Sequence, residues 1–97
     1  MEINELLSLG KGIWGDEELD LKDIIVRLSV VLGDICRWER NAKKDSKNHT
    51  KPELEKEFGN LIFNSILWAS RLGFDPEKCI AAAVEAQRKN VFELLPK

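Results

Sequence analysis

Residues 54–73 read LEKEFGNLIFNSILWASRLG, and this stretch decides the fold class. Apolar residues recur on nearly every side of the helix that it predicts, so the helix should be covered almost all round. Glu57, Asn60 and Asn64 are polar exceptions at i, i+3 and i+7, which places them along one side. Buried polar groups on a helix face one another, a ligand or a metal ion. This polar stripe is therefore where the sequence indicates a functional site.

Length and composition predict one domain, residues 1–97. The chain is 43% hydrophobic and 33% charged, which is typical of a globular protein, but its size allows only a modest core that oligomerisation would extend. A net charge of −2 argues against a general nucleic-acid or anionic-membrane binder. Cys36 and Cys79 lack metal-ligand or CxxC spacing, which favours reduced thiols. Since there is also no long apolar run and no signal peptide, we expect a cytoplasmic protein with no membrane or nucleic-acid partner.

Helix-breaking glycines and a helix-capping aspartate predict two helices in the first half of the chain. A short apolar segment at 3–9 is expected to stop at a cluster of glycines, namely Gly10, Gly12 and Gly15. Asp20 is placed to cap a long second helix over about 21–41, with Asp23 at its third position. A polar loop without apolar anchors follows.

Two more helices are predicted in the second half. Thr50 and Glu53 form a capping pair around Pro52 at the start of the third helix. Gly73 is expected to end this helix in the left-handed region. The sequence Asp75-Pro76 then opens a fourth helix that runs to about residue 90.

The second helix has two different sides when its residues are advanced by about 100° each. The apolar side is expected to face the core and consists of Leu21, Ile25, Leu28, Leu32 and Cys36. The opposite side combines polar residues with a tryptophan, and we expect it to be covered by a partner helix or a second subunit: Asp23, Arg27, Asp34 and Trp38, flanked by Val30 and Val31. If the second and third helices are antiparallel, their polar stripes meet in one cleft, with Arg27, Asp34, Glu57, Asn60 and Asn64 as its candidates.

Three stretches carry a family resemblance: VLGDI at 31–35, KEFGNLI at 56–62 and LGFDPE at 72–77. Over roughly residues 21–90 the chain resembles the MazG-type all-α nucleoside triphosphate pyrophosphohydrolases. The resemblance implies an antiparallel bundle of three to four helices, assembled through helices two and three as a homodimer or homotetramer. It also implies magnesium-dependent cleavage of an NTP or dNTP to the monophosphate and pyrophosphate.

The family holds magnesium with Glu-Glu-x-x-Glu on one helix and Glu-x-x-Asp on the other. The first motif here reads Val30, Val31 and Asp34, and the second reads Glu57 and Asn60, so only Glu57 is kept. The resemblance thus implies a reduced magnesium site of Asp34, Glu57 and Asn60, completed by triphosphate oxygens, with magnesium weak or absent. It leaves open whether the chain is an enzyme.

Candidate contacts to a nucleoside triphosphate are basic, amide or aromatic side chains: Arg27, Trp38, Asn64, Arg88 and Lys89. Arg27 has an alternative role, because an ion pair with Asp34 or Glu57 would fill the space of a metal ion. Tryptophans are more often buried anchors than base-stacking platforms. His49 has no partner at metal or triad spacing, so we expect no chemistry from it.

Three functions follow from these observations. The first is a MazG-like pyrophosphohydrolase with a reduced metal site. The second is a relative that binds nucleotide without turnover. The third is a structural helical oligomer or partner-binding module, in which ion pairs and asparagine hydrogen bonds fill the cleft.

Overall fold

The computed structural model describes residues 1–44, 47 and 49–94, the last four by their backbone. Within this part the chain forms four helices and no strand: α1 (Ile3–Trp14), α2 (Leu21–Arg40), α3 (Lys51–Arg71) and α4 (Pro76–Leu94). The predicted all-α class is confirmed. In the described ranges, none of the helices combines the length and the hydropathy needed to span a bilayer.

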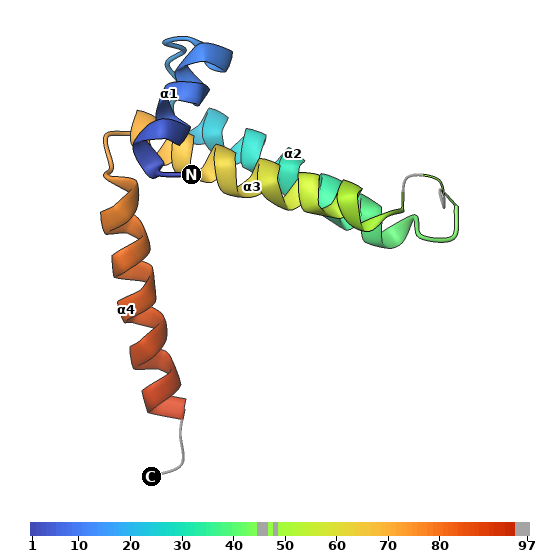
Figure 1. The fold of residues 1–97 in the computed structure, drawn as a ribbon. Helices are drawn as coiled ribbons and strands as arrows, with labels where there is room; N and C mark the ends of the chain where they lie inside the picture. Colours follow the sequence, from blue (N-terminus) through green and yellow to red (C-terminus); the bar gives the residue numbers. More distant parts are fainter. Residues whose placement is uncertain (45–46, 48, 95–97) are drawn as a thin grey trace.

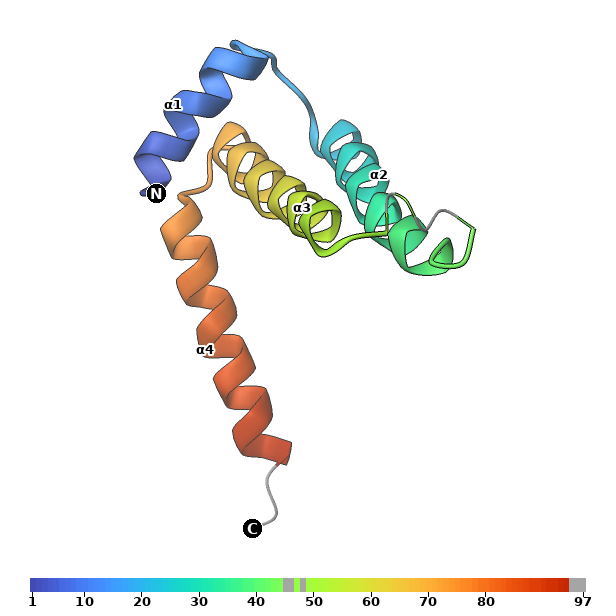
Figure 2. The ribbon, with the colours of Figure 1, turned by 45° about the vertical axis from the view of Figure 1, so that its right-hand side comes forward.

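α2 and α3 lie side by side as an antiparallel pair, which we call the hairpin (Figure 1). α1 packs on α3 at the end where α2 begins and α3 ends. α4 leaves that same end at a steep angle and extends away from the side on which α1 lies, as the turned view also shows (Figure 2). The structure is therefore a three-helix body with one projecting arm.

The helix ends follow the capping signals of the sequence. The backbone N–H of Asp23 donates to Asp20 Oδ1 at 2.8 Å, and the N–H of Glu53 donates to Thr50 Oγ1 at 3.4 Å. These bonds satisfy N–H groups that have no partner within their own helix. Gly73 has φ 91°, the left-handed conformation that glycine adopts without a steric penalty. The predicted starts of α2 and α3 and the stop after α3 are confirmed.

The core lies where α1 meets the hairpin. Its buried apolar side chains are Ile24 of α2 and Leu67 and Trp68 of α3, the last only 1% exposed. Around them pack partly buried apolar side chains, namely Leu7, Leu19, Leu28, Phe63 and Leu72. This core is small for a chain of 97 residues, because many of the large apolar side chains are exposed on the surface instead.

Two arginines hold the segment that connects α1 and α2, residues 15–20, against the core. The Arg27 guanidinium lies 5.1 Å from the Trp14 ring centroid and 5.3 Å from that of Trp68, and its Nη2 is 2.7 Å from Glu17 Oε1. Arg71 donates to the backbone oxygen of Glu17 at 2.8 Å. Cations over aromatic faces are attracted by the ring quadrupole. Arg27 is thus part of the fold, and it pairs with Glu17 rather than with Asp34 or Glu57, the partners of its alternative role.

α1 does not stop at its glycines. It continues through Gly10 and Gly12 to Trp14, so the prediction of a break there is wrong. Gly10 is buried because α1 approaches α3 closely at this point. A Cβ at Gly10 would lie 2.7 Å from Leu67 Cδ1, whereas a Cβ at Gly12 would meet nothing within 4 Å.

We expect Gly10→Ala to lower the free energy of unfolding by about 1–3 kcal/mol, because the added methyl group overpacks the contact with Leu67. Gly12→Ala is the matched control, and we expect it to raise stability by about 0.5–1 kcal/mol, since alanine favours the helix and finds open space. Urea unfolding of both variants measures the two effects. Equal effects of the two substitutions would contradict a close approach at Gly10.

The apolar side of α2 is not in the core. Leu21, Ile25 and Leu32 are each more than half exposed and Cys36 is exposed, so the expected core side is wrong except at Leu28. α2 instead turns Ile24, Val31 and Asp34 toward its own chain, where all three are buried or partly buried. The expectation that the polar side is covered is confirmed only in part, because Arg27, Val31, Asp34 and Trp38 are partly buried whereas Asp23 and Val30 are exposed.

α3 exposes apolar residues on the same side of the hairpin. Phe58 and Ile62 stand roughly a quarter-turn from the line along which α3 contacts α2, as Ile25 and Leu32 do on α2. Because the two helices run in opposite directions, these offsets place the side chains of both helices on the same side of the hairpin. The result is one apolar face, made of Leu21, Ile25, Leu32, Phe58 and Ile62.

Candidate functional site

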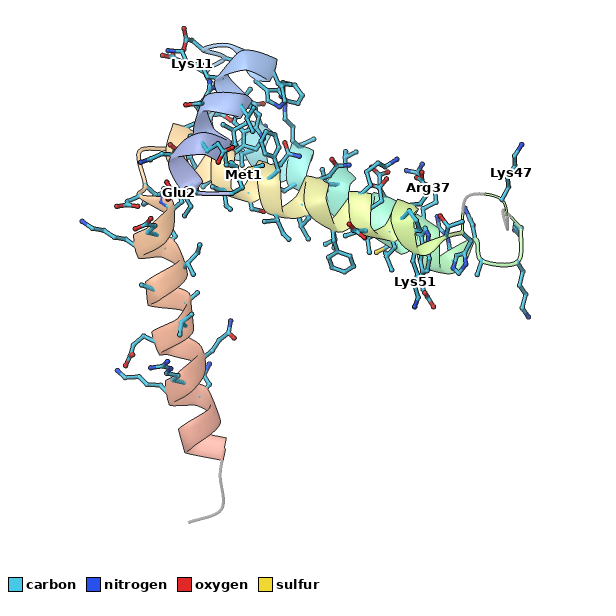
Figure 3. The ribbon with its side chains drawn as sticks, viewed as in Figure 1. Met1, Glu2, Lys11, Arg37, Lys47 and Lys51 are labelled. Carbon is cyan, nitrogen blue, oxygen red and sulfur yellow. The ribbon has the colours of Figure 1, made fainter. Side chains whose placement is uncertain are left out.

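A pocket of about 320 Å³ opens at the end of the hairpin far from the core. Five of its lining residues come from the hairpin helices: Asp34, Arg37 and Trp38 from α2, and Glu53 and Glu57 from α3. Arg37 lies on the same side of the hairpin as α1, opposite to the direction of α4 (Figure 3). The pocket and the apolar face are therefore on opposite sides of the hairpin.

The connection between α2 and α3 closes the pocket with Asn41 and His49. The His49 ring stacks on the Trp38 ring, with centroids 3.7 Å apart and planes 20° apart. Trp38 Nε1 in turn donates to the backbone oxygen of Thr50 at 3.2 Å. His49 has no partner at metal or triad spacing in the sequence, and in the structure the chain folds back over α2 at this point and sets the His49 ring against Trp38. The stack fixes one wall of the pocket.

Glu57 is the most buried carboxylate of the pocket, with its side chain 16% exposed. Its Oε1 lies 3.6 Å from Lys56 Nζ. Its Oε2 is buried, and no group in the described part of the chain donates a hydrogen bond to it. A buried carboxylate oxygen without a donor is costly. A cation placed in the pocket would satisfy it.

The other charges of the pocket are paired. Arg37 Nη2 lies 2.7 Å from Asp34 Oδ1, one helical turn away. Lys56 Nζ lies 2.9 Å from Glu53 Oε2. The hydrogen bond to Glu53 and the negative charge of that residue raise the pKa of Lys56, and Glu57 adds a smaller effect in the same direction. Asp34 and Glu57 therefore face the pocket with different surroundings, one paired with arginine and one incompletely satisfied.

The structure brings together only some of the predicted site residues. Asp34, Glu57 and Trp38 line one pocket. Asn60 is exposed outside that lining, and the Asn64 amide donates to the backbone oxygen of Asn60 at 2.7 Å, on its own helix.

The basic candidates lie elsewhere. Arg27 is at the core end of the hairpin, held by Glu17. Arg88 and Lys89 are exposed on α4, which points away from the pocket of its own chain (Figure 1). Within one chain, none of these three side chains lines the pocket.

Four pocket residues were not among the predicted site residues: Arg37, Asn41, His49 and Glu53. The sequence holds a signal for Arg37, because it follows Asp34 at the i+3 spacing of a helical ion pair. It holds none for His49, whose position depends on how the connection packs over Trp38.

The donor set fits a magnesium ion only when a ligand completes it. Among the residues that the structure describes, no group of three or more histidine, cysteine, aspartate or glutamate side chains is arranged to hold a metal ion. Asp34 and Glu57 supply two carboxylates at one pocket. Magnesium is commonly held by one or two carboxylates together with phosphate oxygens and water. The pocket thus suits a magnesium–phosphate ligand better than a free metal ion.

Comparison with known proteins returns no significant match. No family model matches the sequence, and neither the curated proteins nor the solved structures include a significantly similar chain. The function of this protein is accordingly inferred from the pocket and from the residues that line it.

Proposed function

We propose that this protein is a MazG-like nucleotide-binding protein of the nucleoside triphosphate pyrophosphohydrolase type. The observation that carries the proposal is the buried Glu57 Oε2, which has no hydrogen-bond donor among the described residues and shares a pocket with Asp34. These are the two carboxylates that remain at the family's motif positions. Their meeting in one pocket supports a common ligand, a magnesium–triphosphate.

Each wall of the pocket has a role in this proposal. Asp34 and Glu57 would hold Mg²⁺, which neutralises phosphate charge and activates water when it is bound. Arg37 would exchange its bond to Asp34 for phosphate oxygens, which guanidinium groups bind bidentately. The Trp38–His49 stack supplies aromatic surface beside the base.

The Arg37–Asp34 ion pair favours a second candidate, a relative that binds nucleotide without turnover. An arginine bound to one of only two carboxylates competes with magnesium for it. Release of pyrophosphate separates the two candidates, because binding is common to both.

We further propose that the protein is a homodimer assembled through α2 and α3. The apolar face supports this, since contiguous exposed apolar residues on a small protein mark an interaction surface. A second copy brings an identical face, so two such faces bury each other around a twofold axis.

We expect Glu57→Gln to weaken magnesium-dependent binding of nucleoside triphosphates at least about tenfold, because a neutral amide oxygen is a weaker ligand for Mg²⁺ than a charged carboxylate. Glu55→Gln is the matched control, since it removes the same charge from an exposed position of the same helix. Isothermal titration of a triphosphate panel in the presence of magnesium measures both. Equal affinities of the two variants would overturn the assignment of Glu57.

A further inference from the structure

α4 is covered very little by its own chain. It contacts mainly the end of α3, and every side chain described from Glu77 to Asn90 is exposed. Ile80 and Val84, one turn apart, are close to half exposed, and Phe74 before the helix is 60% exposed. Helices in proteins owe most of their stability to packing of an apolar side against another surface. The apolar residues of α4 therefore need another surface.

The overall dimensions indicate a second copy of this chain as that surface. The chain exposes 7891 Å², whereas a compact monomer of its mass exposes about 5,700 Å². Its radius of gyration is 16.5 Å, against about 12.5 Å for a compact domain of the same length. The excess is about 2,200 Å² per chain, or about 4,400 Å² for two chains. This total lies within the range of about 2,000–5,000 Å² that obligate dimers bury.

The direction of α4 restricts how two copies can pack. α4 projects on the side of the hairpin opposite to α1 and Arg37 (Figures 1 and 3). Helix geometry places the apolar face on that side as well, because Ile25 and Leu32 stand about 120–140° round α2 from Arg37. If two apolar faces met with the hairpins parallel, both α4 arms would emerge at the same end and collide. With the hairpins antiparallel, each arm passes the free end of the other hairpin, where the pocket lies.

α4 is long enough to reach the pocket side of the partner hairpin. Packed helix layers are about 8–10 Å apart, so the pocket side of the partner hairpin is roughly 15–20 Å from the start of the arm. Arg88 lies twelve residues beyond Pro76, and at 1.5 Å per residue this is about 18 Å along the helix. Arg88 and Lys89 would thus reach the level of the partner's pocket.

We propose that the dimer is antiparallel and that the α4 arm of each protomer brings Arg88 and Lys89 to the pocket of the other. This inference rests on the proposed dimer and nucleotide site, and it makes each pocket incomplete without the second copy. The two cations would meet the phosphates of a ligand whose metal ion is held by Asp34 and Glu57. Within its own chain, α4 points away from that pocket (Figure 1).

Site-directed crosslinking of the full chain tests this arrangement. Both native thiols are exposed and are first removed as Cys36→Ser and Cys79→Ser. In that background, one tagged chain carries Lys89→Cys and a differently tagged, co-expressed chain carries Lys43→Cys, two residues after Asn41 of the pocket lining. We expect a short bismaleimide to join Lys89→Cys to Lys43→Cys of the partner subunit in most dimers that carry both tags.

The matched control replaces Lys43→Cys by Lys11→Cys, on α1 at the other end of the hairpin. We expect at least about a tenfold lower yield from it. Equal yields, or no crosslink in a chain that light scattering shows to be dimeric, would overturn the arm exchange and leave the nucleotide site standing. A strong crosslink in a protein that binds no nucleotide would support the arm exchange and refute the proposed function.

Discussion

Ile25→Glu and Ile62→Glu are each expected to convert the dimer into a monomer. The two side chains are 54% and 56% exposed in the single chain, so neither substitution removes a core contact. In the proposed dimer each places two unpaired carboxylates in the apolar interface, related by the twofold axis. Burying such charges costs several kcal/mol, and we expect the dissociation constant to rise at least about 100-fold, or about 2.7 kcal/mol.

Val30→Glu is the control for this experiment. Val30 is 59% exposed on the same helix, but it stands about 140° round α2 from Ile25 and so outside the apolar face. The same change of residue type should leave the dimer intact. Light scattering across a concentration series gives the mass of each variant, and circular dichroism checks that the helices persist. Dissociation by Val30→Glu alone would place the interface on the other side of α2.

Restoring two acids of the family motif is expected to strengthen magnesium binding. Val31→Glu with Asn60→Asp adds a carboxylate on each hairpin helix, one turn from Asp34 and from Glu57 respectively. Hard oxygen ligands and negative charge both favour Mg²⁺, and we expect affinity to rise at least about tenfold. Thermal unfolding should then shift upward on addition of magnesium, because a ligand that binds only the folded state stabilises it.

Ile13→Glu with Asn4→Asp is the matched control, since both residues are exposed on α1, far from the pocket, and Ile13 is 68% exposed. It changes the net charge equally and should leave magnesium affinity close to that of the native chain. If the Val31→Glu pair instead lowers the melting temperature with and without magnesium, the pocket is a structural contact. The added charge is then buried without a partner.

Local signals in the sequence were sufficient for the helices. The caps at Asp20 and Thr50 and the stop at Gly73 depend on hydrogen bonds and backbone freedom within a few residues, and all three are found as predicted. Gly10 was misread because glycine weakens an isolated helix but also permits close packing. Which effect decides depends on Leu67, far away in the sequence.

The orientation of α2 was the main error. An apolar stripe shows that a side of a helix avoids water, but it does not show which surface covers it. Here α2 turns Val31 and Asp34 toward α3 and leaves Ile25 and Leu32 exposed. The same limit applies to the site. Motif spacing identified Asp34 and Glu57, whereas His49 joined them through long-range packing of the connection on Trp38.

Titration of the purified protein with magnesium and a panel of ribo- and deoxynucleoside triphosphates, with pyrophosphate measured in the same samples, tests the nucleotide site most directly. We expect magnesium-dependent binding of at least one triphosphate, weakened by Glu57→Gln and retained by Glu55→Gln. Release of pyrophosphate would identify a working pyrophosphohydrolase, and its absence a binding protein without turnover. No binding of any triphosphate, with or without magnesium, would contradict the nucleotide site at Asp34 and Glu57.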